Sequence, residues 1–113
     1  MDGMLTFDDD TAKLLETAYL GADFRRRRQA SFDSLTPRPG QVIADIGCGN
    51  GLMTVELARA VGPQGLVMGI DPSSDMLSAA KERLVNADNV RLLEGSAEAL
   101  PVDDSSLDGA VSL

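Results

Sequence analysis

The sequence lacks histidine and contains a single cysteine, and these two absences exclude several kinds of site. One cysteine cannot build an internal disulfide framework. Without histidine, and with Cys48 alone, a zinc or transition-metal site is not expected. Histidine is also the commonest general base, so any acid–base chemistry would have to come from Asp, Glu, Tyr or Lys.

Long apolar runs are absent too, and no stretch of the 113 residues approaches the length of a membrane span. The N-terminal residues 1–4 have neither the basic region nor the apolar core of a signal peptide, so a cytoplasmic location is expected. Positive charge is scarce, since 10 Lys and Arg stand against 18 Asp and Glu, a net charge of −8. We therefore expect no nucleic-acid partner, because phosphate contacts need a basic surface.

Residues 1–40 have the spacing of helices, and we expect them to form an N-terminal helical segment. Gly21 is expected to break the first helix, and Asp23 to cap a second one that Pro37 stops. The basic run 25–28 would lie in this second helix. A solvated helix face paired with local acids is the favoured interpretation of that run, and nucleic-acid contact is the alternative.

From Gln41 onward the pattern changes, because short runs rich in apolar and β-branched residues alternate with helical spacing. We expect strands at 42–46, 66–70, 90–94 and 108–113, with helices after the first two. The segment 95–107 is expected to be a loop with one helical turn at 97–100. This alternation predicts right-handed βαβ units and a parallel sheet, which is an α/β fold.

Residues 45–51, with the sequence DIGCGNG, connect the first expected strand to the first expected helix. Ligands of α/β sheets bind beyond the carboxyl ends of the strands, and glycines let the backbone approach them closely. A dinucleotide site requires Gly-x-Gly-x-x-Gly, but Leu52 and Thr54 stand where the third glycine is needed. The lysine of a phosphate-binding P-loop is missing as well.

The pattern that does match, Asp-x-Gly-x-Gly-x-Gly, resembles that of the class I S-adenosylmethionine-dependent methyltransferases, in particular the small-molecule branch of ubiquinone and menaquinone biosynthesis. Four segments carry the resemblance in order: 42–54, 67–76, 90–101 and 106–113. It implies a Rossmann-like three-layer sandwich. Residues 41–113 would be an incomplete cofactor-binding portion of it, with about four parallel strands in the order 3-2-1-4 after the helical segment 1–40.

The resemblance also implies which residues of the glycine segment bind S-adenosylmethionine. Gly47, Cys48 and Gly49 would surround the methionine and ribose parts through their backbone. Asp45 would meet the amino group of the cofactor, or hydrogen-bond the N–H groups of the loop, or both. A nucleophilic role for Cys48 is less favoured than a role as a small packing residue, because it has no histidine partner.

The second and third strands supply the remaining residues of the implied site. Asp71 would accept hydrogen bonds from both ribose hydroxyls, with capping of the next helix as its alternative role. Pro72 and Met76 would lie beside the adenine, although a place in the core is the simpler expectation for Met76. Ser96 would accept from the adenine amino group where many relatives have an acidic residue, and Ala97 would offer its N–H.

The function that follows is methyl transfer from S-adenosylmethionine to a small-molecule acceptor, by an enzyme or by its cofactor-binding fragment. No catalytic residue is assigned. The resemblance also lets Tyr19 or one of the arginines at 25–28 reach the methionine carboxylate. The alternative function is a non-catalytic cofactor-binding or assembly module, since complete members continue beyond the fourth strand. An exposed fourth strand would favour a homo-oligomer.

Overall fold

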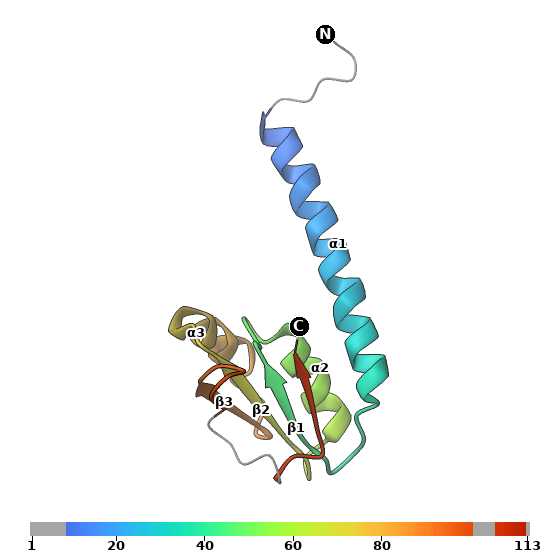
Figure 1. Cartoon of the computed structure of the whole chain (residues 1–113), viewed down its shortest axis with the longest axis vertical. Coiled ribbons are helices and arrows are strands. Elements are labelled where there is room, and N and C mark those ends of the chain that lie inside the picture. Colours follow the sequence, from blue (N-terminus) through green and yellow to red (C-terminus); the bar gives the residue numbers. More distant parts are fainter. Residues whose placement is uncertain (1–8, 101–105, 113) are drawn as a thin grey trace.

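The computed structural model describes residues 9–100 and 106–112. They form three helices and four strands, in which the sheet follows a long N-terminal helix (Figure 1). The helices are α1 (Asp9–Leu35), α2 (Leu52–Val61) and α3 (Ser74–Arg83), and the strands are β1 (Val42–Ile46), β2 (Leu66–Asp71), β3 (Val90–Glu94) and β4 (Gly109–Ser112). The strands and the two short helices begin and end close to where the sequence predicted them.

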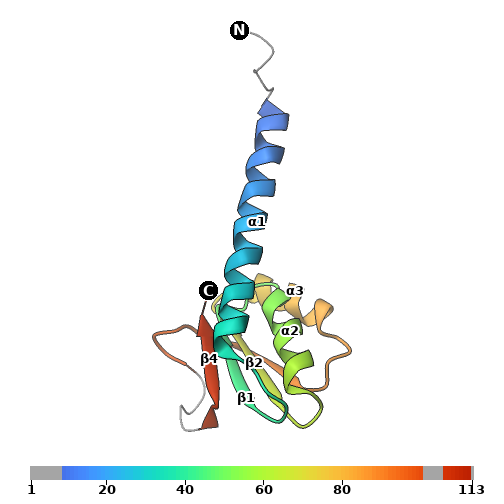
Figure 2. The same ribbon diagram turned by 90° about the vertical axis from the view of Figure 1, so that its right-hand side faces the viewer.

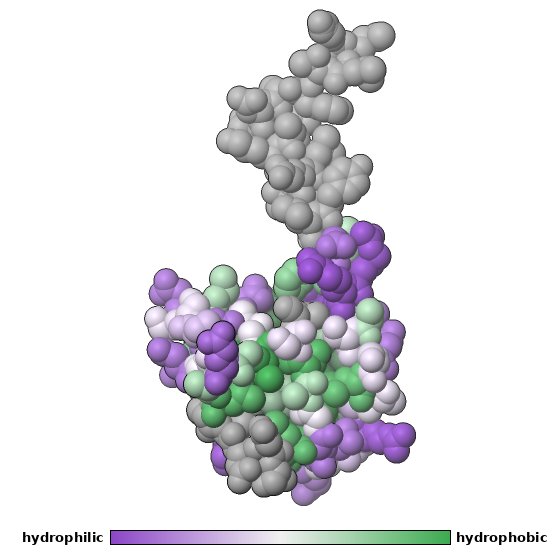
Figure 3. All heavy atoms as spheres, viewed as in Figure 1, coloured by the Kyte–Doolittle hydropathy of each residue, from purple (hydrophilic) through white to green (hydrophobic). Residues whose placement is uncertain are grey.

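All four strands are parallel and lie in the order β3-β2-β1-β4, which confirms the predicted order. Figure 2 shows α2 and α3 on the same side of the sheet, as two successive right-handed crossovers require. The opposite face carries a band of apolar residues in Figure 3. The described residues therefore form two layers of the Rossmann-like arrangement.

The core lies between the sheet and α2. Ile43, Val67 and Val111 come from three neighbouring strands and share one face of the sheet. The side of α2 that faces them has apolar residues at helical spacing, as the sequence predicted. The buried members from α2 are Met53, Leu57, Ala58 and Val61.

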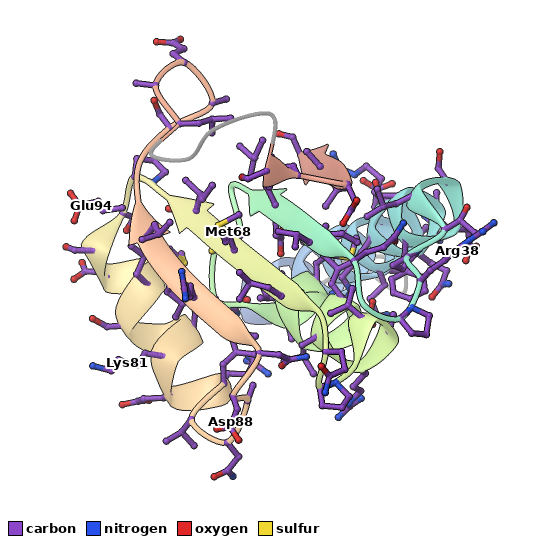
Figure 4. All side chains as sticks on the ribbon, turned by 90° about the horizontal axis from the view of Figure 1, so that it is seen from below. Arg38, Met68, Lys81, Asp88 and Glu94 are labelled. Carbon is purple, nitrogen blue, oxygen red and sulfur yellow. The ribbon has the colours of Figure 1, made fainter. Side chains whose placement is uncertain are left out.

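The periphery of the sheet is charged. Figure 4 shows Arg38, Lys81, Asp88 and Glu94 projecting outward, whereas Met68 lies within the sheet.

The C-terminal part of α1 packs against the core through Phe32 and Leu35, which are partly buried. This contact holds α1 beside β4 and α2.

The first helix differs from the expectation. The structure has one continuous helix through Gly21, where the sequence predicted a break and two helices. A glycine costs only about 1 kcal/mol in a helix interior, and the residues on both sides are adequate helix formers. Asp23 caps no helix, and its carboxylate instead pairs with Arg26 at 3.9 Å and Arg27 at 3.1 Å along the same helix.

The helix end was predicted correctly: α1 stops at Leu35, and Thr36, which precedes Pro37, takes a positive φ of 52°. The helical turn expected at 97–100 is wrong. The Ala99 N–H donates to the Ser96 carbonyl at 3.2 Å, and these two residues form an antiparallel bridge. The expected features at residues 1–8, 101–105 and 113 lie outside the described part of the chain.

The sequence predicted neither a membrane-spanning helix nor a metal site, and the described residues can be inspected for both. Within 9–100 and 106–112, no helix combines the length and the apolar character needed to cross a membrane. Over these ranges, no three His, Cys, Asp or Glu side chains lie together in a way that would hold a metal ion.

Candidate functional site

The glycine segment forms a loop at the carboxyl edge of the sheet, between β1 and α2 (Figure 1). The ends of β2 and β4 lie on either side of it, because Ile46 pairs with Ile70 on one side and with Ser112 on the other. This edge is where α/β sheets bind ligands. The loop therefore lies where the sequence placed the cofactor.

Hydrogen bonds to the end of β2 hold the loop. The N–H groups of Gly47 and Cys48 both donate to the carbonyl of Ile70, at 2.7 and 3.0 Å. The Gly49 N–H donates to Oδ2 of Asp71 at 2.9 Å. Two strands that are adjacent in the sheet thus share a hydrogen-bonded loop.

The three glycines of the loop have different surroundings, although all have positive φ. A Cβ on Gly47 or Gly49 would meet nothing within 4 Å, so their α-carbons face open space. A Cβ on Gly51 would lie 3.2 Å from Ala80 and Leu84, against α3 and its end. Gly47 and Gly49 leave room for a ligand, whereas Gly51 allows two helices to pack closely.

The first turn of α2 follows the loop without a side-chain cap. Gly51 is the N-cap residue in a left-handed conformation, and no side chain bonds the N–H groups of that turn. The turn also carries no acidic residue. Uncapped N–H groups at a helix start favour a carboxylate or phosphate.

Asp71 is the last residue of β2 and is buried. Its two oxygens each accept one N–H: Oδ2 from Gly49, and Oδ1 from Ser73 at 2.9 Å. The predicted alternative role, in organising the start of α3, is therefore present, while the hydroxyl of Ser73 caps the helix by accepting from the Met76 N–H at 3.2 Å. An ionised carboxylate has about four acceptor positions, so each oxygen of Asp71 retains acceptor capacity.

Asp45 lies below the loop and is only 1% exposed. Its Oδ2 accepts a hydrogen bond from the Thr54 hydroxyl at 2.7 Å. Burial raises the pKa of Asp45 from 3.8 to about 6; the Thr54 hydrogen bond opposes this increase, and the charge of Asp71 adds to it. The carboxylate thus holds a proton more readily than an exposed aspartate does.

Cys48 is a buried packing residue, as the favoured interpretation had it. Burial, together with the charges of Asp45 and Asp71, raises the pKa of the thiol to about 12. A thiol with such a pKa remains protonated at neutral pH and is a poor nucleophile.

The residues proposed for the adenine lie around the start of α3. Pro72 is exposed, and Met76 is 48% exposed, so the expectation of a core place for Met76 is wrong. The Gly95 N–H donates to the Asp71 carbonyl at 3.2 Å, which places the next segment beside this strand end. Ser96 is partly buried and Ala97 is exposed in the turn that follows.

Two residues that shape the site were missed by sequence reasoning. Thr54 is buried in the first turn of α2, and a polar residue on that apolar face was the available signal. Arg83 donates from Nε to the carbonyl of Asn50 at 3.0 Å and so ties the end of α3 to the loop. No sequence spacing indicates a contact of this kind.

Comparison with known proteins identifies the family. The methyltransferase domain family matches residues 43–113. A demethylmenaquinone methyltransferase of Staphylococcus aureus is 45% identical over 71 residues, which are 63% of this chain and 30% of that protein. The chain thus spans about a third of the length of the curated relatives that it matches.

Solved structures give the same result for the fold. An S-adenosylmethionine-dependent methyltransferase from Aquifex aeolicus aligns with a TM-score of 0.67 at 24% identity, over 75% of this chain and 46% of that one. A phosphoethanolamine N-methyltransferase of Haemonchus contortus, solved with phosphoethanolamine and S-adenosylhomocysteine, aligns at 0.66 with 26% identity, over 75% of this chain and 18% of that one. These matches confirm the Rossmann-like fold.

The glycine loop at the end of β1, the strand order and the family match over 71 residues agree with one another. They confirm the resemblance to class I methyltransferases, and with it S-adenosylmethionine as the cofactor of the family. This chain belongs to the methyltransferase domain family.

Proposed function

We propose that this chain binds S-adenosylmethionine at the carboxyl edge of β1 and β2 and supplies the cofactor-binding portion of an enzyme that methylates a small molecule. The observation that carries the proposal is the bond between Gly49 and Asp71. This bond joins a loop with open space over its glycines to a buried carboxylate that can still accept hydrogen bonds. The carboxylate would serve the ribose hydroxyls, and the open loop would leave room for the amino-acid part of the cofactor.

The loop would surround the methionine and ribose parts of the cofactor. Gly47 and Gly49 have open space over their α-carbons, and Cys48 lies between them with its side chain buried. The uncapped first turn of α2 offers N–H groups to the methionine carboxylate. Asp71 would accept from the ribose hydroxyls with the acceptor positions that Gly49 and Ser73 leave unused.

The adenine would lie over the start of α3. The exposed side chains of Pro72 and Met76 provide an apolar wall next to Asp71. Ser96 and Ala97 begin the facing segment, where a hydroxyl and an N–H suit the edge of a purine. Transfer of such apolar surface from water would contribute to binding.

Asp45 would act at longer range, because it is too deeply buried to touch a ligand in the loop. Its ionised form would stabilise the cationic amino group of the cofactor through the electrostatic field or through a water molecule. Because burial raises its pKa to about 6, this contribution is present above pH 6 and is lost below it.

S-adenosylmethionine supplies an electrophilic methyl group on a sulfonium. What the protein then has to provide is placement of the acceptor in line with that methyl group, which alone accounts for large rate factors. The name of the Staphylococcus aureus relative gives a quinone-type acceptor, and the Haemonchus contortus neighbour binds phosphoethanolamine. Both support a small molecule as acceptor, and a cytoplasmic site of action is part of the proposal.

A non-catalytic binding or assembly module is the second candidate. It is favoured by β4, which in the described sheet pairs with β1 alone and so has one unpaired side. A parallel edge strand offers N–H and C=O groups to another chain. A homo-oligomer through β4 would satisfy them, and light scattering that shows a stable monomer would refute it.

Calorimetry with S-adenosylmethionine and S-adenosylhomocysteine tests the binding proposal. We expect both to bind, and we expect Asp71→Asn to lower the affinity at least about tenfold, since an amide cannot offer two acceptor oxygens. Asp75→Asn is the matched control, because Asp75 is an exposed carboxylate in the first turn of α3. It should leave the affinity unchanged.

If neither compound gives heat of binding with a chain that circular dichroism shows to be folded, the cofactor site is refuted. Binding without methyl transfer to a panel of quinol and amine acceptors would favour the second candidate. Equal losses in Asp71→Asn and Asp75→Asn would show that general charge, and not the Asp71 carboxylate, governs binding.

A further inference from the structure

A hollow lies between α1 and the end of β4, next to the strand that leads into the proposed cofactor loop. Its volume is about 370 Å³, and its lining residues are Phe24, Arg27, Ala30, Ser31 and Ser112. A neighbouring hollow of about 510 Å³ shares three of these residues and continues along β4 toward Leu35. Together they border residues 110–112 of β4 on the side that faces α1.

The position of Ser112 links the hollow to the cofactor loop. Ser112 pairs with Ile46, and Gly47 follows Ile46 directly. A molecule seated against Ser112 would therefore lie next to the part of the loop that faces open space. On α1, residues 24, 27 and 31 lie at the spacing of one helix face, so that face lines the hollow.

The chemistry of the lining combines an apolar ring with a cation. Phe24 is 46% exposed, and the Arg27 guanidinium carbon lies 5.8 Å from the centre of its ring. The ion pair of Arg27 with Asp23, at 3.1 Å, is solvent-exposed and so contributes little. A guanidinium has five N–H donors, which leaves donors for a second anion.

The surroundings make this spot unusual in an acidic chain. Four of the 10 basic residues stand together at 25–28, and the net charge of the whole chain is −8. Hydrophilic side chains of α1 gather next to the sheet in Figure 3. Arg28 faces Glu56 of α2 at 3.6 Å, so it is engaged across the helices, while Arg27 faces the hollow.

We infer that this hollow is the acceptor pocket and that it selects a flat apolar molecule bearing a carboxylate, with the ring on Phe24 and the anion on Arg27. The inference rests on the proposed function, because it takes the neighbouring loop as the cofactor site. A carboxylate is also present in the methionine part of the cofactor. The uncapped first turn of α2 already suits that group, which leaves Arg27 for the acceptor.

Phenylacetate and phenylacetamide test the pocket, because they share a ring and differ in charge. Titration of the isotope-labelled chain, followed by NMR, should show phenylacetate binding at least about tenfold more tightly. Arg27→Gln should remove that preference. Arg26→Gln is the matched control, since Arg26 shares the partner Asp23, is more exposed and does not line the hollow; it should change neither affinity.

A second variant tests the ring independently of the charge. Phe24→Leu keeps an apolar side chain of similar size but loses the aromatic face, so both phenyl compounds should bind about threefold to tenfold more weakly while the preference for phenylacetate remains. An unchanged affinity for both compounds in Phe24→Leu would overturn the assignment of the ring.

S-adenosylhomocysteine is titrated against the same proteins to separate the two carboxylates. Unchanged affinity in Arg27→Gln supports the acceptor assignment. If Arg27→Gln binds S-adenosylhomocysteine more weakly but phenylacetate as tightly as before, Arg27 binds the cofactor carboxylate and the acceptor assignment is overturned. Equal affinities of the unsubstituted chain for the two phenyl compounds would overturn the assignment as well. Binding of phenylacetate without binding of S-adenosylhomocysteine would refute the proposed function alone and support an anion-selective pocket.

Discussion

The ends of β1 and β4 lie side by side at one edge of the sheet, yet they are built in different ways. At β1 the backbone of the loop is bonded to Ile70 and Asp71, and Asp45 is buried beneath it. At β4 the last residue, Ser112, borders two hollows, and α1 covers the strand only in part. Hydrogen bonds within the chain hold the first region in place, whereas the second region leaves space.

This difference matches the two tasks of the proposed enzyme. A site for a constant ligand gains affinity from preorganised groups, because less ordering is needed on binding. A site for an acceptor can tolerate more change, because open volume lined by few side chains can be altered without disturbing the sheet. The comparison predicts that stability resides mainly on the β1 side.

The largest expected effect comes from replacing a leucine by alanine in the helix that covers each region. Leu57→Ala removes a side chain with 0% exposure between α2 and the sheet, and we expect a loss of about 4 kcal/mol. Leu35→Ala removes a partly buried contact of α1 and should cost about 1 kcal/mol. Urea unfolding followed by circular dichroism measures both. Equal losses would contradict the comparison, since α1 would then be as firmly packed as α2.

The next effect is the dependence of stability on pH. Burial raises the pKa of Asp45 from 3.8 to about 6, so between these values the folded chain binds a proton that the unfolded chain releases. Stability should therefore fall by about 3 kcal/mol as the pH rises from about 4 to above 6. Asp45→Asn should remove this fall, as measured by urea unfolding at a series of pH values.

Thr54→Val refines the same prediction. The Thr54 hydroxyl lowers the pKa of Asp45, so its replacement by a side chain of equal size should raise that pKa and extend the fall in stability to higher pH. A fall that ends at the same pH in Thr54→Val as in the unsubstituted chain would show that the hydrogen bond does not stabilise the ionised carboxylate.

The smallest effect separates two glycines within the loop. Gly51→Ala places a methyl group 3.2 Å from Ala80 and Leu84 at a φ of 87°, and should cost about 2 kcal/mol. Gly49→Ala has the strain of a φ of 55° but open space, and should cost about 1 kcal/mol.

Affinity for S-adenosylhomocysteine should rank these two variants in the opposite order, with the greater loss in Gly49→Ala, whose methyl group would enter the space for the ligand. Thermal unfolding and calorimetry on the same samples measure the two rankings. If Gly51→Ala also loses the more affinity, Gly49 does not face the ligand.

Much of the sheet was predictable because its signals are local. The apolar runs at 42–46, 66–70 and 90–94 each ended at a residue that the structure places at the carboxyl edge of the sheet. The resemblance to class I methyltransferases implied that Asp71, at the end of the second strand, is a site residue, and the structure shows that Asp71 bonds the glycine loop. Whether it also binds the ribose remains a prediction.

Two of the errors concern local conformation, and the third concerns which side of a helix is covered. Gly21 was expected to end a helix, but its penalty is small beside the propensity of the residues around it. The turn at 97–100 had helical composition, yet a bridge between Ser96 and Ala99 closes it. The side chain of Met76 was expected in the core, but α3 turns it outward next to Pro72.

The sequence by itself determined the α/β class, the positions of the strands and the kind of loop after β1, because spacing and glycine content act within a few residues. Only the tertiary structure decided that Gly49 faces open space while Gly51 packs on α3, and that Thr54 bonds Asp45. It also brought Arg27 and Ser112, which are far apart in the sequence, to the lining of one hollow. Contacts of this kind depend on how separate elements pack, which no local pattern records.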